Sequence, residues 1–553
     1  MNLHKLSTIA LGLTFSSTVF AQTTLIKNVN GYTINNNELV KFHAIQITDD
    51  KIDKIFTQSI KVPTNLSASI TIQDAKGKTM LPGLIDAHGH VLSYGNSLMQ
   101  ADLLNTQSEQ AGVERAQIYA KANPSVSWIT GRGWNQVQWQ SKEFPTAQSL
   151  DKAFPDKPVW LRRVDGHAGW ANSKAMEIAG ITAETKSPDG GEIIRDKNGK
   201  PTGVFIDNAM DLIAKNIAPL TQTQLKSTLV KAMNSLASMG LTSVHDAGID
   251  TENLKANNAI TNENNMPTRI NAMLYLPSEN WQQTIDKGAF NSKDHLLNFN
   301  SVKIQADGAL GSRGAALIED YSDHAGHKGL LLHDSDSLNH YIDAAMKGGL
   351  QVNTHAIGDN ANKIVLDAYE SAIKANKSKA LRHRVEHAQV LRIQDIPRFD
   401  ELGIIASMQA THATSDKNMA QDRLGEERIL GAYAWRKLLN ANAVIAAGSD
   451  FPVESPNPFF GLHASVTRQD KQNSPEGGWF ADEKMTRFEA LKSFTIDAAY
   501  SGHQEKLLGS LAPGKKADFI ILKDDYYKSN ETQLWQNQVI ETWVNGKQVF
   551  NAK

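Results

Sequence analysis

The sequence has no cysteine among its 553 residues. Disulfide bonds, thiolate metal ligands and a lipid-modified N-terminal cysteine are therefore excluded. The chain also lacks an excess of charge of either sign, because its formal net charge is −2. No overall positive field indicates binding to nucleic acid or another polyanion. We therefore expect a small-molecule substrate as the partner, and the sequence leaves open whether the chain forms a homo-oligomer.

Long apolar runs are also missing. Beyond the N-terminus, no stretch approaches the roughly 18 uninterrupted apolar residues that span a bilayer, so stable membrane insertion is not expected. The N-terminus has a positive residue, Lys5, and a short apolar run over residues 9–20 that ends in Val19-Phe20-Ala21. This pattern is typical of a secretory signal peptide, and a buried N-terminal helix is the weaker alternative. We expect residues 1–21 to be a signal peptide, cleaved after Ala21, of an exported periplasmic or secreted protein.

The central part of the chain alternates between strand patterns and helical patterns. With 41% hydrophobic and 21% charged residues, the chain is globular and can bury a large core. One connecting helix has a clear start, because Thr221 and Gln224 form a capping box before an apolar helix face. Eight strands that alternate with helices predict an α/β fold, a closed (β/α)₈ TIM barrel. The predicted strands are residues 84–90, 241–246, 269–276, 302–307, 350–355, 383–387, 404–409 and 443–450.

Both ends of the chain have β-type patterns. Short runs separated by turn residues occur near each end, with turns predicted at residues 28–31, at residues 48–51 and at Asn545-Gly546. We expect residues 22–80 and 508–553 to form one small, discontinuous β-sandwich domain. The residues between them, 81–507, then form the barrel domain.

About 150 residues separate the first two predicted strands, far more than a crossover helix needs. We therefore predict an insert subdomain at about residues 96–220, with a β-hairpin over residues 192–205 that turns at Asn198-Gly199. Because the insert follows a barrel strand, we expect it over the barrel mouth. Its tryptophans could line a pocket there or pack the insert's own core. They are Trp128, Trp134, Trp139, Trp160 and Trp170.

Potential metal ligands recur at the predicted strand ends. His88 and His90 share one face of a strand, and two imidazoles at this spacing can bind one metal ion. Lys303 has apolar neighbours, and a buried ammonium needs a counter-charge or must lose its charge. Each residue alone has a structural explanation, as a hydrogen-bonded histidine or a capping aspartate. The set that together favours a hydrolytic metal site is His88, His90, Lys303, His355, His387 and Asp450.

Around these residues the chain resembles the amidohydrolase superfamily, in particular the third amidohydrolase family, which includes N-substituted formamide deformylases. The similar stretches extend from residue 81 to about residue 522, nearly the whole mature chain. Several motifs in this order are more specific than any one of them. The motifs are residues 82–90, 165–173, 303–313, 355–359, 384–387, 448–453 and 509–518.

The resemblance implies a site for one or two divalent cations, with zinc as the expected metal. Lys303 matches the lysine that is carboxylated by carbon dioxide in related enzymes and bridges two metal ions. An unmodified Lys303 would favour a mononuclear site. Asp450 would be both a ligand and the catalytic base. The other implied ligands are His88, His90, His355 and His387.

Four further residues are candidates for substrate contacts. Arg313 could hold a carboxylate in a fork. A purely structural role is an equal alternative for each of the four. They are His167, Trp170, Arg313 and His412.

The sequence therefore predicts an exported, metal-dependent hydrolase of a carbon–nitrogen bond other than a peptide bond, of the amide or formamide type. Activated water would be the nucleophile. Ester hydrolysis or deamination by the same site is the alternative among enzymes, because water activation does not choose the leaving group. A barrel that has lost turnover and acts as a binding protein is the alternative from another class. Loss of ligands would favour that reading, and no ligand position is missing.

Overall fold

The structure is a computed structural model that describes residues 22–59, 70–136, 139–164, 166, 168–188 and 191–552. At its centre, eight parallel strands follow one another in the order of the chain, which confirms the predicted (β/α)₈ barrel. Each predicted strand overlaps an observed one. The barrel strands are β6 (Leu84–Gly89), β13 (Leu241–Ile249), β14 (Arg269–Leu276), β16 (Leu297–Gln305), β17 (Gln351–Ala356), β18 (Arg384–His387), β19 (Ile405–Gln409) and β20 (Ile445–Gly448).

The first and last barrel strands, β6 and β20, meet at their carboxyl ends. The backbone N–H of Asp450 donates to the carbonyl of His88 at 2.7 Å. The Ser449 hydroxyl donates to the buried carboxylate of Asp86 at 2.7 Å. Gly448 permits this approach, because a Cβ at its position would lie 2.6 Å from the backbone nitrogen of His88. The contact between β6 and β20 therefore places His88 and Asp450, two predicted ligands far apart in the sequence, side by side.

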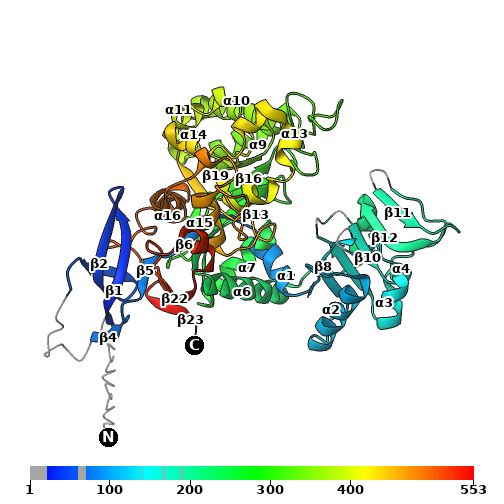
Figure 1. The fold of residues 1–553 in the computed structure, drawn as a ribbon, viewed down its shortest axis with the longest axis horizontal. Helices are drawn as coiled ribbons and strands as arrows, with labels where there is room; N and C mark the ends of the chain where they lie inside the picture. The colour runs from blue at the N-terminus through cyan, green and yellow to red at the C-terminus, as the bar shows by residue number, and fades with distance from the viewer. Residues whose placement is uncertain are drawn as a thin grey trace, which may run out of the picture.

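Helices surround the barrel (Figure 1). The helix with the predicted capping box is α6 (Gln222–Ser238), in which Thr221 and Gln224 make both hydrogen bonds of the box. Its apolar face packs into the main core. The helices that connect later strands are α7 (Thr251–Asn262), α8 (Trp281–Asp286), α9 (Ser335–Lys347), α10 (Asp359–Asn376), α11 (Arg398–Leu402), α12 (Ala410–Asp416), α13 (Ala420–Arg428) and α14 (Trp435–Asn440).

Strands from both ends of the chain form one eight-stranded sheet, in the order β23-β22-β21-β5-β1-β2-β3, with β4 paired to β1. The sheet lies near the amino-terminal ends of the barrel strands, where a buried ion pair joins Arg269 Nε to Asp518 at 2.6 Å. It is therefore remote from the strand ends that carry the predicted ligands. Its strands are β1 (Thr23–Asn35), β2 (Glu38–Thr48), β3 (Lys51–Phe56), β4 (Ile70–Asp74), β5 (Thr79–Pro82), β21 (Phe519–Leu522), β22 (Val539–Val544) and β23 (Lys547–Asn551).

The turn predicted at residues 28–31 is wrong, because β1 continues through this segment. The pairing register between β1 and β2 shifts there, so the turn residues form an irregularity within the strand. The hairpin turn lies instead at Asn36 and Asn37, which have φ values of 50° and 61°. Asparagine tolerates this left-handed conformation, which such hairpin turns require. The turns predicted at residues 48–51 and at Asn545-Gly546 are confirmed.

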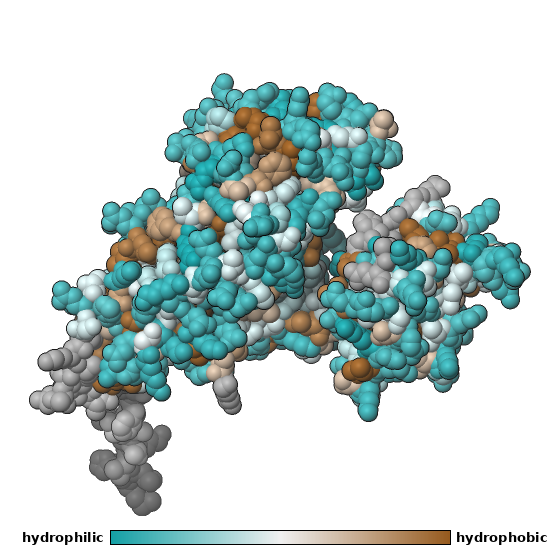
Figure 2. Space-filling view, viewed as in Figure 1, coloured by the Kyte–Doolittle hydropathy of each residue, from teal (hydrophilic) through white to brown (hydrophobic). Residues whose placement is uncertain are grey.

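The insert forms a six-stranded sheet of its own and leaves the carboxyl end of β6 through α1 (Val91–Leu98). Figures 1 and 2 show it as a separate lobe beside the barrel. The predicted hairpin is confirmed as the antiparallel pair of β11 and β12. The elements are β7 (Ala101–Asp102), α2 (Glu109–Ala122), β8 (Ile129–Trp134), α3 (Ala147–Ala153), β9 (Val159–Arg163), β10 (Ala168–Ala171), α4 (Ser173–Ile178), β11 (Gly191–Arg195) and β12 (Pro201–Asp207).

The insert's tryptophans pack its own interior. Trp134 donates its indole N–H to the Leu161 carbonyl at 2.8 Å, and Trp139 donates to the Thr106 carbonyl at 3.0 Å. Both rings belong to one buried apolar cluster of the insert, and Trp160 belongs to a second. The alternative in which these residues pack a core therefore holds for them.

The predicted signal peptide, residues 1–21, lies outside the described residues. Among the helices that the structure does describe, none has both the length and the apolar character needed to cross a bilayer.

Candidate active site

His88 and His90 stand at the carboxyl end of β6 on either side of a glycine that cannot be replaced without a clash. A Cβ on Gly89 would lie 2.2 Å from the Phe451 ring. The imidazole centroids of the two histidines are 5.5 Å apart. The backbone N–H that follows them donates to Asp246 at 3.0 Å, which fixes the start of α1. The strand end is therefore held so that both imidazoles face the same carboxylate.

That carboxylate belongs to Asp450. Its Oδ1 lies 2.9 Å from His90 Nε2 and 3.6 Å from His88 Nε2, whereas its Oδ2 lies 3.6 Å from His412 Nε2. The backbone of Asp450 has a φ of 61°, a strained conformation for a residue other than glycine. Burial raises the pKa of Asp450, but the neighbouring imidazoles, His90 first, outweigh this and lower it well below its usual range. The carboxylate is therefore ionised and surrounded by histidines.

His387 ends β18, and its left-handed backbone (φ 73°) departs from the strand there. Its ring centroid lies 4.8 Å from that of His88 and 4.5 Å from that of His355. The His387 Nδ1–H donates to the side-chain oxygen of Gln409 at 2.7 Å. Burial lowers the pKa of His387 well below its usual range, so the ring is neutral. Its Nε2 is then the nitrogen available to a metal ion.

His355 lies at the end of β17, with its Nε2 3.4 Å from the carboxylate of Asp307. Asp307 is fully buried and accepts hydrogen bonds of 2.8–3.0 Å from three backbone N–H groups, two of them directly after β17. Asp307 therefore fixes the loop that follows His355. It is a supporting residue that the sequence did not distinguish from other strand-end residues.

Lys303 lies on β16 and is 5% exposed. Burial lowers the pKa of its amine, while the nearby carboxylates of Glu386 and Asp450 act in the opposite direction. The lysine is therefore buried, as its apolar neighbours in the sequence predicted, and the acidic groups near it can supply the counter-charge that a buried ammonium needs.

The donor atoms at this rim fit a divalent cation. The Nε2 atoms of His88, His355 and His412 are buried without a hydrogen-bond partner among the described residues. Burying such atoms unpaired is costly, and a bound cation removes the cost. Burial lowers the pKa of His88 to about 4, so its imidazole is neutral as metal binding requires. Neutral imidazoles beside an ionised carboxylate are a donor set that suits zinc.

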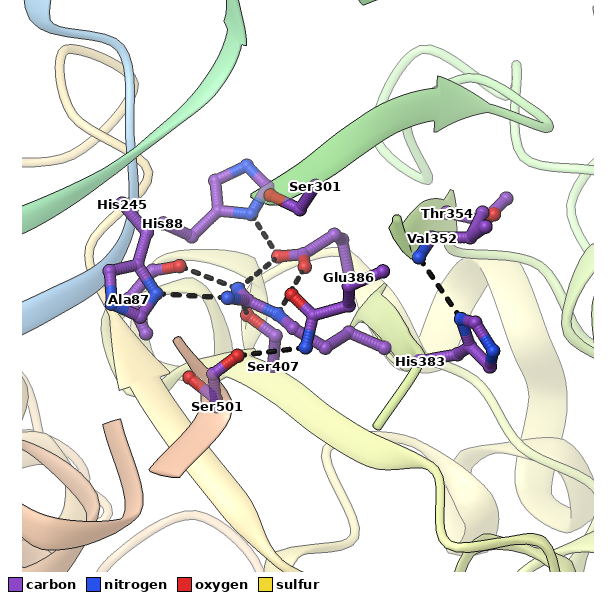
Figure 3. A network of polar contacts seen from close by, with 12 residues as sticks. Ala87, His88, His245, Ser301, Val352, Thr354, His383, Glu386, Ser407 and Ser501 are labelled. Carbon is purple, nitrogen blue, oxygen red and sulfur yellow. Dashed lines mark hydrogen bonds and ion pairs between the residues drawn. The ribbon is translucent and has the colours of Figure 1, made fainter. Parts of the chain in front are cut away.

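A buried network contacts the Nδ1 side of the His88 ring, away from Asp450 (Figure 3). The Nδ1–H of His88 donates to the carboxylate of Glu386, and both side chains are fully buried. Arg384 forms an ion pair with Glu386 at 2.7 Å and donates to Ser407 at 2.8 Å and to His245 Nδ1 at 2.9 Å. Burial raises the pKa of Glu386, but Arg384 and His88 outweigh this and lower it. The ionised Glu386 thus keeps the proton of His88 on Nδ1 and leaves Nε2 free.

The sequence carried a signal for part of this network. Arg384 and Glu386 alternate with an apolar residue on a short strand, so both face the barrel interior with opposite charges. Two inward charges on a buried strand must pair, and this pattern could have identified Glu386 as a partner of a ligand. No comparable signal marked Gln409, whose role depends on how β19 leads into α12.

The structure gives different outcomes for the four residues predicted to contact substrate. His167 lies outside the described residues. Trp170 is fully buried in the insert and donates to the Thr146 carbonyl at 2.8 Å, so its surroundings favour the purely structural role. Arg313 makes the predicted fork, but onto Asp323 of the same chain at 2.8 and 3.2 Å, which favours its structural alternative. His412 is the one of these residues that the structure places beside Asp450.

Comparisons with known proteins agree with this architecture. Residues 71–550 match the profile of the Amidohydrolase family. The chain is 33% identical over 481 residues to the putative amidohydrolase YtcJ of Bacillus subtilis (strain 168), covering 86% of this chain and 89% of that one. It is 26% identical over 516 residues to N-substituted formamide deformylase of Arthrobacter pascens, covering 91% and 94%. The crystal structure of an uncharacterized metal-dependent hydrolase from Pyrococcus horikoshii OT3 is similar with a TM-score of 0.77 at 27% identity, covering 92% of this chain and 99% of that one. As its motifs predicted, the chain belongs to the amidohydrolase family.

Proposed function

We propose that this protein is an exported, zinc-dependent amidohydrolase that cleaves a non-peptide carbon–nitrogen bond of the amide or formamide type in a small molecule. The observation that carries the proposal is the set of buried, unpaired imidazole nitrogens around the Asp450 carboxylate. A cation beside an ionised carboxylate is suited to the hydrolysis of acyl derivatives. The similarity to N-substituted formamide deformylase supports the choice of bond.

Asp450 is the proposed catalytic base. Zinc held by these histidines would lower the pKa of water towards about 7 and polarise a carbonyl group. The Asp450 carboxylate accepts a proton from the attacking water and returns it to the leaving nitrogen. A positioned acid–base group of this kind typically contributes about 10² to 10⁴ in rate. His90, whose Nε2 lies 2.9 Å from Asp450 Oδ1, keeps the carboxylate in position.

For Lys303 we propose modification by carbon dioxide to a carbamate. The side chain is only 5% exposed, and carboxylation would replace a buried amine with anionic oxygen ligands. Mass spectrometry of the intact protein under native conditions would detect the carbamate as an added carbon dioxide that acid removes.

Two other functions stay in competition with this proposal. An esterase or deaminase could use the same donor atoms, since these do not select the leaving group. A binding protein without turnover would need no base, whereas the ionised Asp450 is kept in a strained backbone conformation at the centre of the site. The strain favours a catalytic role.

Export rests on the N-terminal sequence. We propose that the mature chain begins at Gln22, after the small residues that end the apolar run. N-terminal sequencing of the protein recovered from periplasmic and culture fractions tests this, and an intact Met1 terminus in the cytoplasmic fraction would contradict it.

The function is tested with purified protein before and after chelation and after the return of zinc. Formamides, other amides, lactams, esters and amino-heterocycles are assayed in parallel. We expect turnover of an amide or formamide that chelation abolishes, that zinc restores and that Asp450→Asn lowers by about 10² to 10⁴. Hydrolysis of esters alone would favour an esterase, and deamination alone would favour a deaminase. Tight metal binding without any turnover would select the binding protein.

A further inference from the structure

Asp450 lies between two pairs of histidines rather than beside one. His88 and His90 face its Oδ1, and His412, which forms a second donor group with His387, faces its Oδ2. In each of these two groups, one donor atom from each histidine and one carboxylate oxygen all lie within 4.8 Å of one another. The carboxylate thus belongs to two separate sets of donors, as a carboxylate that bridges two cations does.

The distance between His412 Nε2 and Asp450 Oδ2 is 3.6 Å. This is too long for a hydrogen bond. Two ligands of one tetrahedral zinc ion lie about 3.4 Å apart when each is about 2.0–2.1 Å from the metal. The observed separation therefore matches a shared ion better than a direct contact. His88 Nε2 lies at the same 3.6 Å from the other carboxylate oxygen.

The His412 nitrogen that faces Asp450 has no other use among the described residues. It is buried and makes no hydrogen bond there, although the side chain as a whole is 13% exposed. The His412 ring stacks on that of His387, with centroids 5.8 Å apart and planes inclined by 19°. Stacked rings can direct their Nε2 atoms to neighbouring positions on one side.

Gln409 links the two histidines of this pair. It ends β19 and precedes α12, the helix that carries His412. Its side-chain N–H donates to the Ser407 carbonyl at 3.2 Å, so its oxygen is the atom that accepts from His387 at 2.7 Å. The His387 proton is thereby fixed on Nδ1, and Nε2 faces the site as a lone pair.

We infer that His412 is a metal ligand, and that His387, His412 and Asp450 form a second cation position that needs no modified lysine. The inference rests on the proposed metal site. It adds His412 as a ligand from α12, the helix that follows the seventh barrel strand, β19. Its consequence is that two ions bind to this chain whether or not Lys303 carries a carbamate. His412 then acts on the reaction through a metal ion rather than by contacting substrate.

The test is a titration of chelator-treated protein with Zn²⁺ in buffer freed of carbon dioxide. Bound metal is measured by inductively coupled plasma mass spectrometry after gel filtration, and circular dichroism and thermal unfolding of the metal-free forms verify the fold. We expect two ions per chain in the wild type and in Lys303→Met, and one in His412→Asn. His412→Gln provides a second variant should His412→Asn fold poorly, and His43→Asn, at an exposed histidine of β2, is the matched control.

An unchanged stoichiometry and affinity in both His412 variants would overturn the inference. So would the loss of one ion in Lys303→Met, because the second position would then depend on the lysine. These readouts do not require turnover. A wild-type protein that binds no zinc at all would instead refute the proposed function itself, so the two failures are distinguishable.

Discussion

His88 donates its Nδ1 proton to Glu386 in the barrel interior, where neither side chain reaches solvent. Glu386 therefore orients the predicted ligand His88. In the sequence, Glu386 directly precedes another predicted ligand, His387. The geometry fixes which nitrogen of His88 can bind metal. Substitution of Glu386 should consequently lower metal affinity directly and affect the rate of turnover only through the bound metal.

Glu386→Gln should lower zinc affinity by about 10- to 100-fold, because the neutral amide no longer holds His88 in one tautomer. Competition with a chromophoric chelator measures the affinity, and thermal unfolding of the metal-free protein reports whether Arg384 tolerates the lost charge. Glu370→Gln, at a surface ion pair with Arg398, is the control and should leave affinity unchanged. Equal affinities in both variants would show that Glu386 does not orient the ligand.

Gly89→Ala should destabilise the protein and weaken metal binding together. The added methyl group would lie 2.2 Å from the Phe451 ring, next to both histidines and Asp450. Overpacking of a rigid core typically costs about 1–3 kcal/mol. Gly112→Ala in α2 is the matched change, because its methyl group would meet only the Trp170 ring at 3.7 Å. Denaturant unfolding and metal analysis should separate the two, and a Gly89→Ala protein with wild-type metal content would contradict the reading of this turn.

His355→Ala should bind metal more weakly while it keeps its fold. The side chain contributes a buried nitrogen without a hydrogen-bond partner among the described residues, so its removal leaves few unsatisfied groups behind. Zinc should then raise the melting temperature of the wild type more than that of the variant, since a ligand present at about 100 times its Kd stabilises by about 2.7 kcal/mol and weaker binding stabilises less. His340→Ala, at an exposed histidine of α9, should respond to zinc like the wild type. The same response in His355→Ala would remove His355 from the ligand set.

Glu489→Gln should reduce stability at neutral pH and lose this effect in acid. Glu489 completes the capping box of α16 (Arg487–Ser493) with Thr486 and receives two hydrogen bonds from Arg436 at 2.7 and 2.9 Å. These contacts, the one with Arg436 first, lower the pKa of Glu489 from 4.5 to about 2. A folded-state pKa below the unfolded one stabilises the protein above about 4.5, and the stabilisation is lost as the pH falls towards about 2.

Denaturant unfolding of the two proteins between pH 7 and pH 3 measures this difference. We expect about 1 kcal/mol at neutral pH, the usual size of a helix cap and a partly exposed charged hydrogen bond. Glu177→Gln, at an exposed pair with Lys174, should show no comparable pH dependence. A difference that is independent of pH would mean that Glu489 acts through packing and not through its charge.

The sequence predicted the barrel because strand and helix patterns are local and repeat eight times. It predicted the rim residues because polar side chains at the ends of apolar strands need a common explanation. It did not predict Glu386 and Gln409, since their partners depend on the pairing of neighbouring strands. The tryptophans of the insert show another limit of the sequence. Their number left a pocket and a core as alternatives, and only the packing showed that Trp134, Trp139 and Trp170 fill a core.

The pairing of β5 with β21, with Pro82 opposite Phe519, also has a consequence for synthesis of the protein. Almost the entire polypeptide must leave the ribosome before β5 can pair with β21. The first barrel strand, β6, likewise cannot contact β20 until β20 has been synthesised. Until then, the nascent chain exposes open strand edges that can recruit other chains into aggregates. Premature stop codons upstream of β21 should therefore yield products that chaperones retain or proteases remove, even when every metal-binding residue has been translated.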